Sequence, residues 1–396
     1  MNEIQKLIHQ HCPNGVEYKK IGDIGVFYGG LSGKSKNDFT DGNAKFITYM
    51  NIYNNLSINI NIKDKVKIAP DEKQKTIKLG DILFTGSSEN IQECGMSSVL
   101  CEEISEEIYL NSFCFGYRLN NPNMLIPGFS KYLFRSDTLR DQIKRTASGV
   151  TRFNVSKKKM AEVIIPIPPL PIQEEIVKIL DTFTDLQTEL EAQLQTELQL
   201  RQKQYKYYRD KLLSFENDGG GGLVEYKTLG EIMNLEYGTN LPQSKRIEGN
   251  YKVYGSNGVV GSHNTFFVAA PVIIIGRKGS AGKLNFVEEN CCPIDTAFYS
   301  VMKTKDNLKF IFYYLQMLNL EKMRIEGGVP GINRNDLYNL KIPIPPLEEQ
   351  ERIVGILDKF DELVSDISLG IPAEIQMRKK QYEYYRDRLL RFEEAL

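Results

Sequence analysis

One stretch of about fifty residues occurs twice in this chain, and an internal repeat constrains the fold more than any other feature of the sequence. The first copy begins with the letters IPIPPL at Ile165, and the second begins with the same letters at Ile342. Aligned positions lie 177 residues apart, and 29 of the 52 aligned residues are identical, without insertion or deletion. A repeat of this length predicts a chain built from two related halves.

Each copy predicts the end of a strand followed by a long helix. The prolines of the IPIPPL segment exclude a helix at that point, whereas Pro171 suits the first helical position. Gly370 and Pro372 indicate a kink in the second copy. Beyond Pro171, apolar residues recur every three or four positions, which places them on one face of a helix. They are Ile172, Ile176, Ile179, Phe183, Leu186, Leu190, Leu194 and Leu198.

A helix of some forty residues is roughly 60 Å long, too long for an ordinary core helix. Its apolar face needs a partner, and the nearest match in the chain is the other copy. We therefore expect the two helices to pack antiparallel as a coiled-coil-like spacer. The alternative is two amphipathic helices that each dock on their own domain.

The regions that precede the two copies are also related, although their sequences have diverged. The letters VEYK occur at Val16 and again at Val224, so the duplication covers the whole chain. Four glycines at Gly219–Gly222 indicate a flexible linker after the first helix. The predicted segments are a first domain (residues 1–164), a helical repeat (165–217), a second domain (218–341) and a second helical repeat (342–396).

Both domains carry short segments with the alternation and the β-branched residues of strands. Helices are expected at Lys131–Arg145 and Lys309–Met323, near the ends of the two domains. The fold class is therefore α+β, with two mainly β domains separated by two long antiparallel helices and related by a pseudo-twofold repeat. The predicted strands are Phe46–Tyr53, Asp81–Gly86 and Phe113–Leu119 in the first domain and Tyr251–Ser256, Pro271–Gly276 and Ala297–Met302 in the second.

Composition narrows the class of protein. The net charge of −1 gives no global basic character, which counts mildly against DNA binding unless the charge is segregated. Six cysteines without a CxxC pair, no signal peptide and no apolar run near the length of a membrane span predict a soluble, cytoplasmic protein.

Some segments resemble catalytic or metal-binding motifs, but none of them matches such a motif fully. The segments Gly29–Ser35 and Gly276–Lys283 resemble phosphate-binding loops, but their glycines have the wrong spacing. His9, His11 and Cys12 lack a second cluster of metal ligands, and an N-terminal surface helix is the better interpretation. The sequence therefore predicts no catalytic residue, no metal and no cofactor within the chain.

What remains is a set of loops whose chemistry suits DNA. Glycines let a backbone approach a phosphate, Arg and Lys read guanine, and Asn reads adenine. Each loop alone is equally well explained as a solvated turn, but the loops recur at matching places in both domains. The candidate DNA contacts are Lys34, Lys36, Ser87, Asn90, Thr151, Arg152 and Asn154 in the first domain and Asn257, His263, Arg277, Lys278, Lys283, Asn333 and Arg334 in the second.

Several of these segments resemble a known family. IPIPPL followed by Gln-Glu, the segments ILDTF and ILDKF, and the segments RQKQYKYYRDKLL and RKKQYEYYRDRLL are similar to those of the specificity subunit of type I restriction–modification systems, the two-repeat kind. CPNGVEYKKIG, GDILFTGSS, GVTRFN and IIIGRKGSAGK also resemble recurring segments of that family. The resemblance covers essentially the whole chain.

The resemblance implies two target recognition domains, each of which reads one half of a split site on double-stranded DNA. It also implies that the helices bind two modification subunits, which would hold S-adenosylmethionine and methylate adenine, and that restriction (translocase) subunits join the complex. The chain itself would be no enzyme. From the repeated tyrosine–arginine segments, the candidate partner contacts are Tyr205, Tyr208, Arg209, Tyr382, Tyr385 and Arg386.

A helical spacer suits this function, because two domains that read half-sites about one DNA turn apart, roughly 34 Å, need a fixed separation. The competing interpretation is a stand-alone coiled-coil scaffold whose two β-rich domains bind proteins or carbohydrate.

Overall fold

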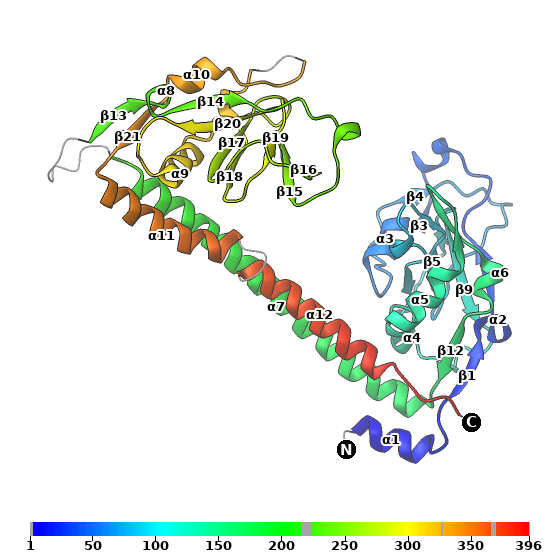
Figure 1. Cartoon of the computed structure of the whole chain (residues 1–396). Helices are drawn as coiled ribbons and strands as arrows, with labels where there is room; N and C mark the ends of the chain where they lie inside the picture. Colours follow the sequence, from blue (N-terminus) through cyan, green and yellow to red (C-terminus); the bar gives the residue numbers. More distant parts are fainter. Residues whose placement is uncertain (1–2, 216–223, 326–327, 366–369, 396) are drawn as a thin grey trace. The chain divides into compact units, whose positions relative to one another are not determined.

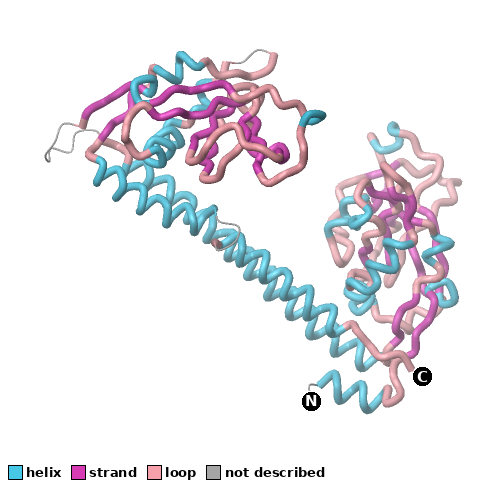
Figure 2. The backbone as a smooth tube through the Cα atoms, viewed as in Figure 1, coloured by secondary structure: helices cyan, strands magenta, loops and turns pink. Residues whose placement is uncertain are grey.

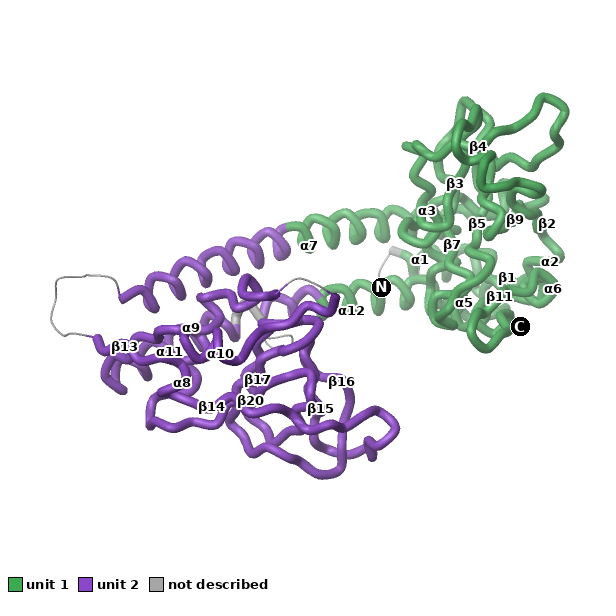
Figure 3. Tube along the Cα trace, turned by 90° about the horizontal axis from the view of Figure 1, so that it is seen from above, with its two compact units in different colours: residues 1–192, 376–396 green, residues 193–375 purple. Residues whose placement is uncertain are grey.

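The chain forms two compact units, shown in different colours in Figure 3. The computed structural model describes residues 3–215, 224–325, 328–365 and 370–395. Unit 1 comprises residues 1–192 and 376–396, and unit 2 comprises residues 193–375. Each unit therefore contains a β-rich domain from one half of the chain and a helical segment from each copy of the repeat.

Unit 1 is built around a four-stranded sheet of order β2-β9-β5-β7, accompanied by smaller sheets of order β4-β3-β8, β10-β11-β6 and β1-β12. Its helices are α1 (Glu3–His11), α2 (Ile21–Ile24), α3 (Tyr49–Asn54), α4 (Pro127–Leu133), α5 (Asp137–Arg145) and α6 (Lys157–Met160), with 3-10 turns η1 (Lys36–Phe39) and η2 (Ile91–Glu93). Its strands are β1 (Glu17–Lys20), β2 (Gly25–Gly29), β3 (Ala44–Ile47), β4 (Lys65–Val66), β5 (Ile82–Thr85), β6 (Ser87–Ser88), β7 (Ser97–Val99), β8 (Ile108–Leu110), β9 (Cys114–Leu119), β10 (Ala147–Ser148), β11 (Phe153–Val155) and β12 (Ile164–Ile167).

Unit 2 repeats three of these sheets, with orders β14-β20-β17-β18, β16-β15-β19 and β13-β21 (Figure 1), whereas its described residues form no sheet equivalent to β10-β11-β6. Its shorter helices are α8 (Leu229–Ile232), α9 (Leu308–Leu318) and α10 (Arg334–Tyr338), with 3-10 turns η3 (Gln243–Lys245) and η4 (Leu320–Met323). Its strands are β13 (Glu225–Thr228), β14 (Met233–Tyr237), β15 (Tyr251–Gly255), β16 (Gly258–His263), β17 (Val272–Gly276), β18 (Leu284–Val287), β19 (Cys292–Pro293), β20 (Ala297–Met302) and β21 (Lys341–Ile344).

The first half of each IPIPPL segment is a strand, and the two copies pair in the same register. Tyr18 lies opposite Pro166 in the pair β1-β12, and Tyr226 lies opposite Pro343 in the pair β13-β21. Proline is tolerated here because each is a two-stranded sheet whose strands have a free edge. The duplication predicted from the sequence is therefore present in the backbone pairing as well.

The long helices are α7 (Leu170–Leu212), α11 (Leu347–Ser365) and α12 (Ile371–Leu389). Figure 2 shows them as the only long helical segments among the described residues. The second copy of the repeat is thus divided into two helices where the sequence predicted a kink. The predicted linker Gly219–Gly222 lies outside the described residues.

Contacts within each unit show that the two copies pack against each other. In unit 1 the rings of Phe183 on α7 and Tyr385 on α12 lie 6.4 Å apart between centroids. In unit 2 Tyr208, near the end of α7, stacks on Phe360 of α11 at 5.6 Å. The early part of α7 thus meets the late part of the second copy, and the late part of α7 meets the early part. This is the antiparallel order that the sequence predicted.

The apolar face of the repeat has a second partner, so the two alternatives for its packing are both partly right. Ile172, Ile176 and Leu180 of α7 are fully buried in the core of the β-rich domain of unit 1. Ile353 and Leu357 of α11, the equivalents of Ile176 and Leu180, are buried in the core of unit 2. Each repeat therefore first docks on its own domain and then pairs with the other copy.

Three predictions about local structure were wrong in part. The segment Phe46–Tyr53 continues as strand only to Ile47, because Thr48 caps α3 by accepting a hydrogen bond from the backbone N–H of Asn51. The single helix expected at Lys131–Arg145 is two helices, since the chain leaves α4 at Phe134 and Ser136 precedes α5. The expected helix at Lys309–Met323 similarly ends at Asn319, whose φ of 53° is left-handed, and continues as a 3-10 turn.

Candidate nucleic-acid interface

In both units, aromatic rings and cationic side chains meet at the same end of the four-stranded sheet. At this end the first strand of the sheet finishes and its antiparallel neighbour begins. In unit 1 Gly29 of β2 lies opposite Phe115 of β9, and in unit 2 Tyr237 of β14 lies opposite Phe298 of β20. We call this place the aromatic–cation edge of each unit.

In unit 2 the edge is formed by two arginines over one ring. The guanidinium groups of Arg277 and Arg334 lie 4.8 and 4.9 Å from the centroid of Tyr237, and that of Arg277 also lies 5.9 Å from Phe298. Tyr237 is 49% exposed, so the arrangement faces solvent. A ring beneath a guanidinium holds it in place without using its N–H donors.

Backbone hydrogen bonds hold the two loops of this edge together. The N–H of Ile332 donates to the carbonyl of Arg277 at 3.1 Å, and the N–H of Gly279 donates to the carbonyl of Pro330 at 2.8 Å. Gly279 has a φ of 75°, which glycine adopts without strain. The side chains of the arginines are anchored once each, Arg277 to the carbonyl of Asp295 and Arg334 to that of Leu235.

In unit 1 the corresponding cations are Arg152 and Lys157. The guanidinium of Arg152 lies 5.8 Å from the ring centroid of Phe113, which is 62% exposed, and its Nε donates to Ser87 Oγ at 3.1 Å. The ammonium of Lys157 lies 5.5 Å from the centroid of Phe115. The pairing of β6 with β11 creates this arrangement, because it places Asn154 opposite Ser87.

The two edges are equivalent in the fold. Lys157 and Arg334 are each the first residue of a short helix, directly after the capping residues Ser156 and Asn333. The four cations of the two edges form no ion pair with any carboxylate of the described residues. Cations held by rings, with N–H donors left over, can bind phosphate oxygens or the O6 and N7 atoms of guanine.

The structure brings together seven of the predicted DNA contacts and leaves the others elsewhere or engaged. Lys34 is largely buried in an ion pair with Glu72, whose pKa this hydrogen bond lowers to about 2. His263 is buried, and its Nδ1 accepts a hydrogen bond from the N–H of Ile247. Those brought to the edges are Ser87, Arg152 and Asn154 in unit 1 and Arg277, Lys278, Asn333 and Arg334 in unit 2.

The remaining candidates lie on exposed loops near these edges or beyond them. Lys36 begins η1, and Asn90 caps η2 through its side chain. Thr151 is exposed next to Arg152. Lys283 donates to the side chain of Asn257 at 3.0 Å, across from the turn between β15 and β16.

Sequence reasoning missed the rings Phe113, Tyr237 and Phe298 and the cation Lys157. Lys157 could have been found, because it follows Ser156 as Arg334 follows Asn333 in the aligned segments. The rings carry no signal of their own, since strand pairing decides which ring lies beneath which cation.

The candidate partner contacts on the helices are mostly engaged within the protein. Tyr208 stacks on Phe360 and Tyr385 meets Phe183 edge-on, and these two tyrosines stay 39% and 41% exposed. Tyr205 and Tyr382 are half-buried. Arg209 and Arg386 each pair with the aspartate that follows them, Asp210 and Asp387. In contrast, the equivalent tyrosines Tyr207 and Tyr384 are 60% and 61% exposed.

Two further observations bear on the class of protein. In the described part of the chain, His, Cys, Asp and Glu side chains nowhere form a group of three that could hold a metal ion. Among the helices of the described residues, none has both the length and the apolar character that crossing a membrane requires.

Comparison with known proteins shows what the chain resembles. A family described as type I restriction modification DNA specificity domain matches it twice, over residues 13–200 and 222–377. The "type I restriction enzyme EcoR124I/EcoR124II specificity subunit" of Escherichia coli is 37% identical over 274 residues, which are 60% of this chain and 64% of that protein. A putative type I restriction enzyme specificity subunit of Haemophilus influenzae is 34% identical over 267 residues, or 62% of this chain and 68% of that protein. The aligned part thus spans less than two thirds of the E. coli relative.

Solved structures show the same fold. One described as the structural basis underlying complex assembly and conformational transition of the type I R-M system has a TM-score of 0.71 at 20% identity, covering 96% of this chain and 98% of its own. The HsdS subunit from Thermoanaerobacter tengcongensis has a TM-score of 0.53 at 20% identity, with 96% of both chains covered. These matches confirm the α+β fold. Both of the relatives described above are named as specificity subunits.

Proposed function

The chain belongs to the family of type I restriction–modification DNA specificity subunits, and we propose that each of its β-rich domains reads one half of a split sequence on double-stranded DNA. The first reading domain would be residues 1–164 and the second 218–341, with the helical repeats at 165–217 and 342–396. One observation carries the proposal. Two domains of the same topology present an exposed aromatic–cation edge at the same place, with different side chains at each. Equivalent edges with unlike side chains suit two half-sites of unlike sequence.

The chemistry of the two edges suggests how each half-site is read. In unit 2, Arg277 and Arg334 keep N–H donors that a guanine edge accepts, and Tyr237 limits the directions in which they point. In unit 1, Arg152 and Asn154 supply donors for guanine and adenine, while Lys157 suits a phosphate. The DNA contacts that the sequence predicted at these edges are part of this proposal, with Lys157 added.

The helices are the proposed docking surface for two modification subunits, which would bind S-adenosylmethionine and methylate adenine. A restriction subunit would join the same complex. The exposed tyrosines Tyr207 and Tyr384 occupy equivalent positions in the two copies, so each can meet one of two identical partners in the same way. They are better candidates for this contact than Tyr208 and Tyr385, which are less exposed and each contact a phenylalanine of the other copy.

We also propose that α7 sets the length of the DNA spacer. Its first part belongs to unit 1 and its second part to unit 2, and it continues without interruption from one to the other. A helix of this length measures about 65 Å at 1.5 Å per residue. The number of residues in α7 would thus help to determine the spacing between the half-sites.

Methylation mapping tests the proposal. The chain is expressed with its modification partner in a host without adenine methylation of its own, and methylated adenines are located by long-read sequencing. The expected result is a split motif with two defined half-sites and one spacer length. Methylation at a continuous motif, or none above the level of the modification subunit alone, would contradict the proposed function.

A further inference from the structure

In unit 1 the β-rich domain is joined to the helices by hydrogen bonds to one carboxylate. Tyr132 of α4, which is fully buried, donates its hydroxyl proton to Asp181 of α7 at 2.6 Å. The ammonium of Lys131 lies 2.7 Å from the same carboxylate oxygen. The hydroxyl of Thr184 then lies 2.9 Å from Tyr132 Oη and 2.8 Å from Tyr382 Oη on α12. The domain, the first helical copy and the second copy thus meet at one point.

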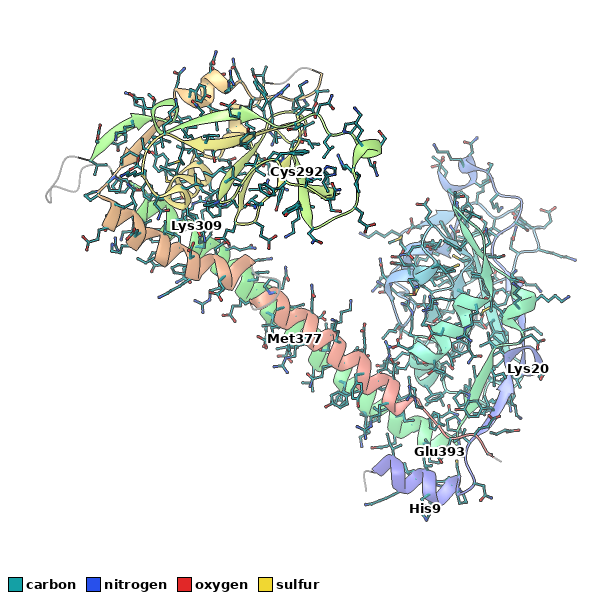
Figure 4. The ribbon with its side chains drawn as sticks, viewed as in Figure 1. His9, Lys20, Cys292, Lys309, Met377 and Glu393 are labelled. Atoms are coloured by element: carbon teal, nitrogen blue, oxygen red, sulfur yellow. The ribbon has the colours of Figure 1, made fainter. Side chains whose placement is uncertain are left out.

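Unit 2 contains the same kind of junction with different residues. Tyr313 of α9, which is 1% exposed, donates to Asp358 of α11 at 2.5 Å, and Lys309 lies 3.1 Å from that carboxylate. Lys309 projects from α9 beside α11 (Figure 4). The third member is Tyr205 of α7, whose hydroxyl donates to Gln316 of α9 at 3.3 Å.

The two junctions exchange their helical partners. Asp181 and Asp358 occupy equivalent positions of the two copies, and so do Tyr205 and Tyr382. The aspartate always comes from the copy that follows the domain in sequence, and the tyrosine comes from the other copy. Each domain is therefore fixed to both copies of the repeat at once, although neither the lysine nor the domain tyrosine is part of the repeat.

These hydrogen bonds give the docking a preferred direction, which the apolar contact does not provide. Burial of Ile172, Ile176 and Leu180 stabilises the docking, but a hydrophobic contact has no preferred direction. A hydroxyl that donates to a carboxylate has both a direction and a narrow range of distance. Burial, followed by the hydrogen bond to its aspartate, raises the pKa of both Tyr132 and Tyr313, so both hydroxyls keep the proton that they donate.

We propose that the Tyr132–Asp181 and Tyr313–Asp358 hydrogen bonds are positioning contacts that fix the angle of each reading domain on the helices and thereby restrict the complex to one spacer length. This rests on the proposed function, because only a split-site reader has a spacer to measure. In this proposal Tyr132 and Tyr313 contact no base. They determine the orientation in which each domain contacts its half-site.

The test uses the whole complex and the double variant Tyr132→Phe/Tyr313→Phe. DNA duplexes carry the two half-sites mapped for the wild-type complex, with the native spacer or with one base pair added or removed. Methyl transfer from labelled S-adenosylmethionine is measured for each duplex. The double variant removes two hydrogen bonds to charged groups and is expected to raise the ratio of altered-spacer to native-spacer methylation by at least about ten-fold, because the loss of one such bond already corresponds to about ten-fold.

The control is Tyr117→Phe. Tyr117 is also fully buried and donates its hydroxyl proton to the carbonyl of Ile21 at 2.7 Å, but this hydrogen bond lies within the domain and involves neither copy of the repeat. This variant should lower stability without changing the spacer ratio. If the double variant does not assemble, each single variant leaves one junction intact and should show a smaller increase of the same sign.

A double variant that keeps the wild-type spacer ratio, or a control that changes it equally, would overturn the inference while leaving the proposed function intact. A wild-type complex that methylates no duplex with separated half-sites would instead overturn the proposed function.

Discussion

Two arginines of this protein show how surroundings decide whether a side chain is available to a ligand. Arg118 binds the fully buried carboxylate of Asp81 through Nε at 2.7 Å and Nη2 at 2.6 Å, and Tyr28 donates to the same carboxylate at 2.6 Å. Among the described residues, the guanidinium of Arg277 contacts only the rings of Tyr237 and Phe298 and one backbone carbonyl. The first arginine is committed to stability, whereas the second keeps N–H donors that are available to a ligand.

Replacement of Arg277 by alanine is expected to affect one half-site only. A good bidentate contact to a base contributes about 1–3 kcal/mol of discrimination, so methylation of DNA with one altered base in that half-site should rise relative to the native site. Arg324→Ala, which removes an exposed arginine paired with Glu321 in the same unit, is the matched control. Unchanged discrimination at both half-sites in R277A would count against the aromatic–cation edge as the reading surface.

Replacement of Asp81 by asparagine should instead destabilise unit 1. Removing one partner of a buried ion pair typically costs about 3–5 kcal/mol, and the 32% exposure of the Arg118 side chain favours the lower end of that range. Asp141→Asn, which removes an exposed ion pair with Lys144, should cost less than about 1 kcal/mol. Urea unfolding followed by tyrosine fluorescence measures both, and equal losses would show that the Asp81 network is not structural.

The buried thiols predict a dependence on alkaline pH. Burial, with a smaller contribution from the neighbouring Cys292, raises the pKa of Cys291 to about 12, and burial likewise raises that of Cys114 to about 12. Because both values lie above the ordinary value near 8.5, this contribution to stability is complete at neutral pH and is lost as the pH rises towards 12. Iodoacetamide at pH 8.5 should leave both thiols unmodified in the folded protein and modify them in urea. Mass spectrometry reads the outcome, and rapid native labelling of either would contradict it.

At the scale of elements, the repeat was predictable because its pattern is long and periodic. The strands of the central sheets, such as β5 and β17, were also predictable, because continuous β-branched or apolar runs bounded by glycine identify buried strands. Short apolar runs do not distinguish a strand from a helix. In the segment that starts at Phe46, the capping residue Thr48 begins a helix. The serine at Ser136 was a visible helix start that the prediction overlooked.

The candidate site was predictable in its cations but not in its rings. Arginines flanked by glycines, such as Arg277, stand out in a sequence because loops of this kind approach ligands closely. Tyr237 and Phe113 look like ordinary strand residues, and only sheet register places them beneath guanidinium groups. The prediction of Lys34 as a DNA contact failed for a similar reason, because its ion-pair partner Glu72 is distant in sequence and only the fold brings the two together.

The docking of each repeat on its own domain predicts unequal effects along one helix face. Ile176→Ala should destabilise unit 1 by about 2–5 kcal/mol, because Ile176 is fully buried in its core. Leu186→Ala, ten positions along the same predicted stripe, should change stability by less than about 0.5 kcal/mol, because Leu186 is 58% exposed. Thermal unfolding compares the two. Similar losses would mean that the face acts along its whole length as a helix–helix seam.

At the scale of the whole molecule, both copies of the repeat supply helices to each of the two different β-rich domains. Each unit is completed by a segment of the other copy, residues 376–396 in unit 1 and residues 193–212 of α7 in unit 2. The base-reading residues would vary from one domain to the other, while the equivalent aspartates and tyrosines of the repeat stay the same. Sequence specificity and spacing would thus be set by separate parts of the chain.

Inserting one turn of helix into α7, within Glu189–Leu198, tests this separation most directly. One turn adds about 5.4 Å, between one and two base-pair steps of about 3.4 Å. The same four residues inserted in the exposed turn at Asn123 of unit 1 are the control. Methylation mapping of the complex should then show a spacer one or two base pairs longer with both half-sites unchanged, and an unchanged motif for the control. Altered half-sites with a constant spacer would contradict the account.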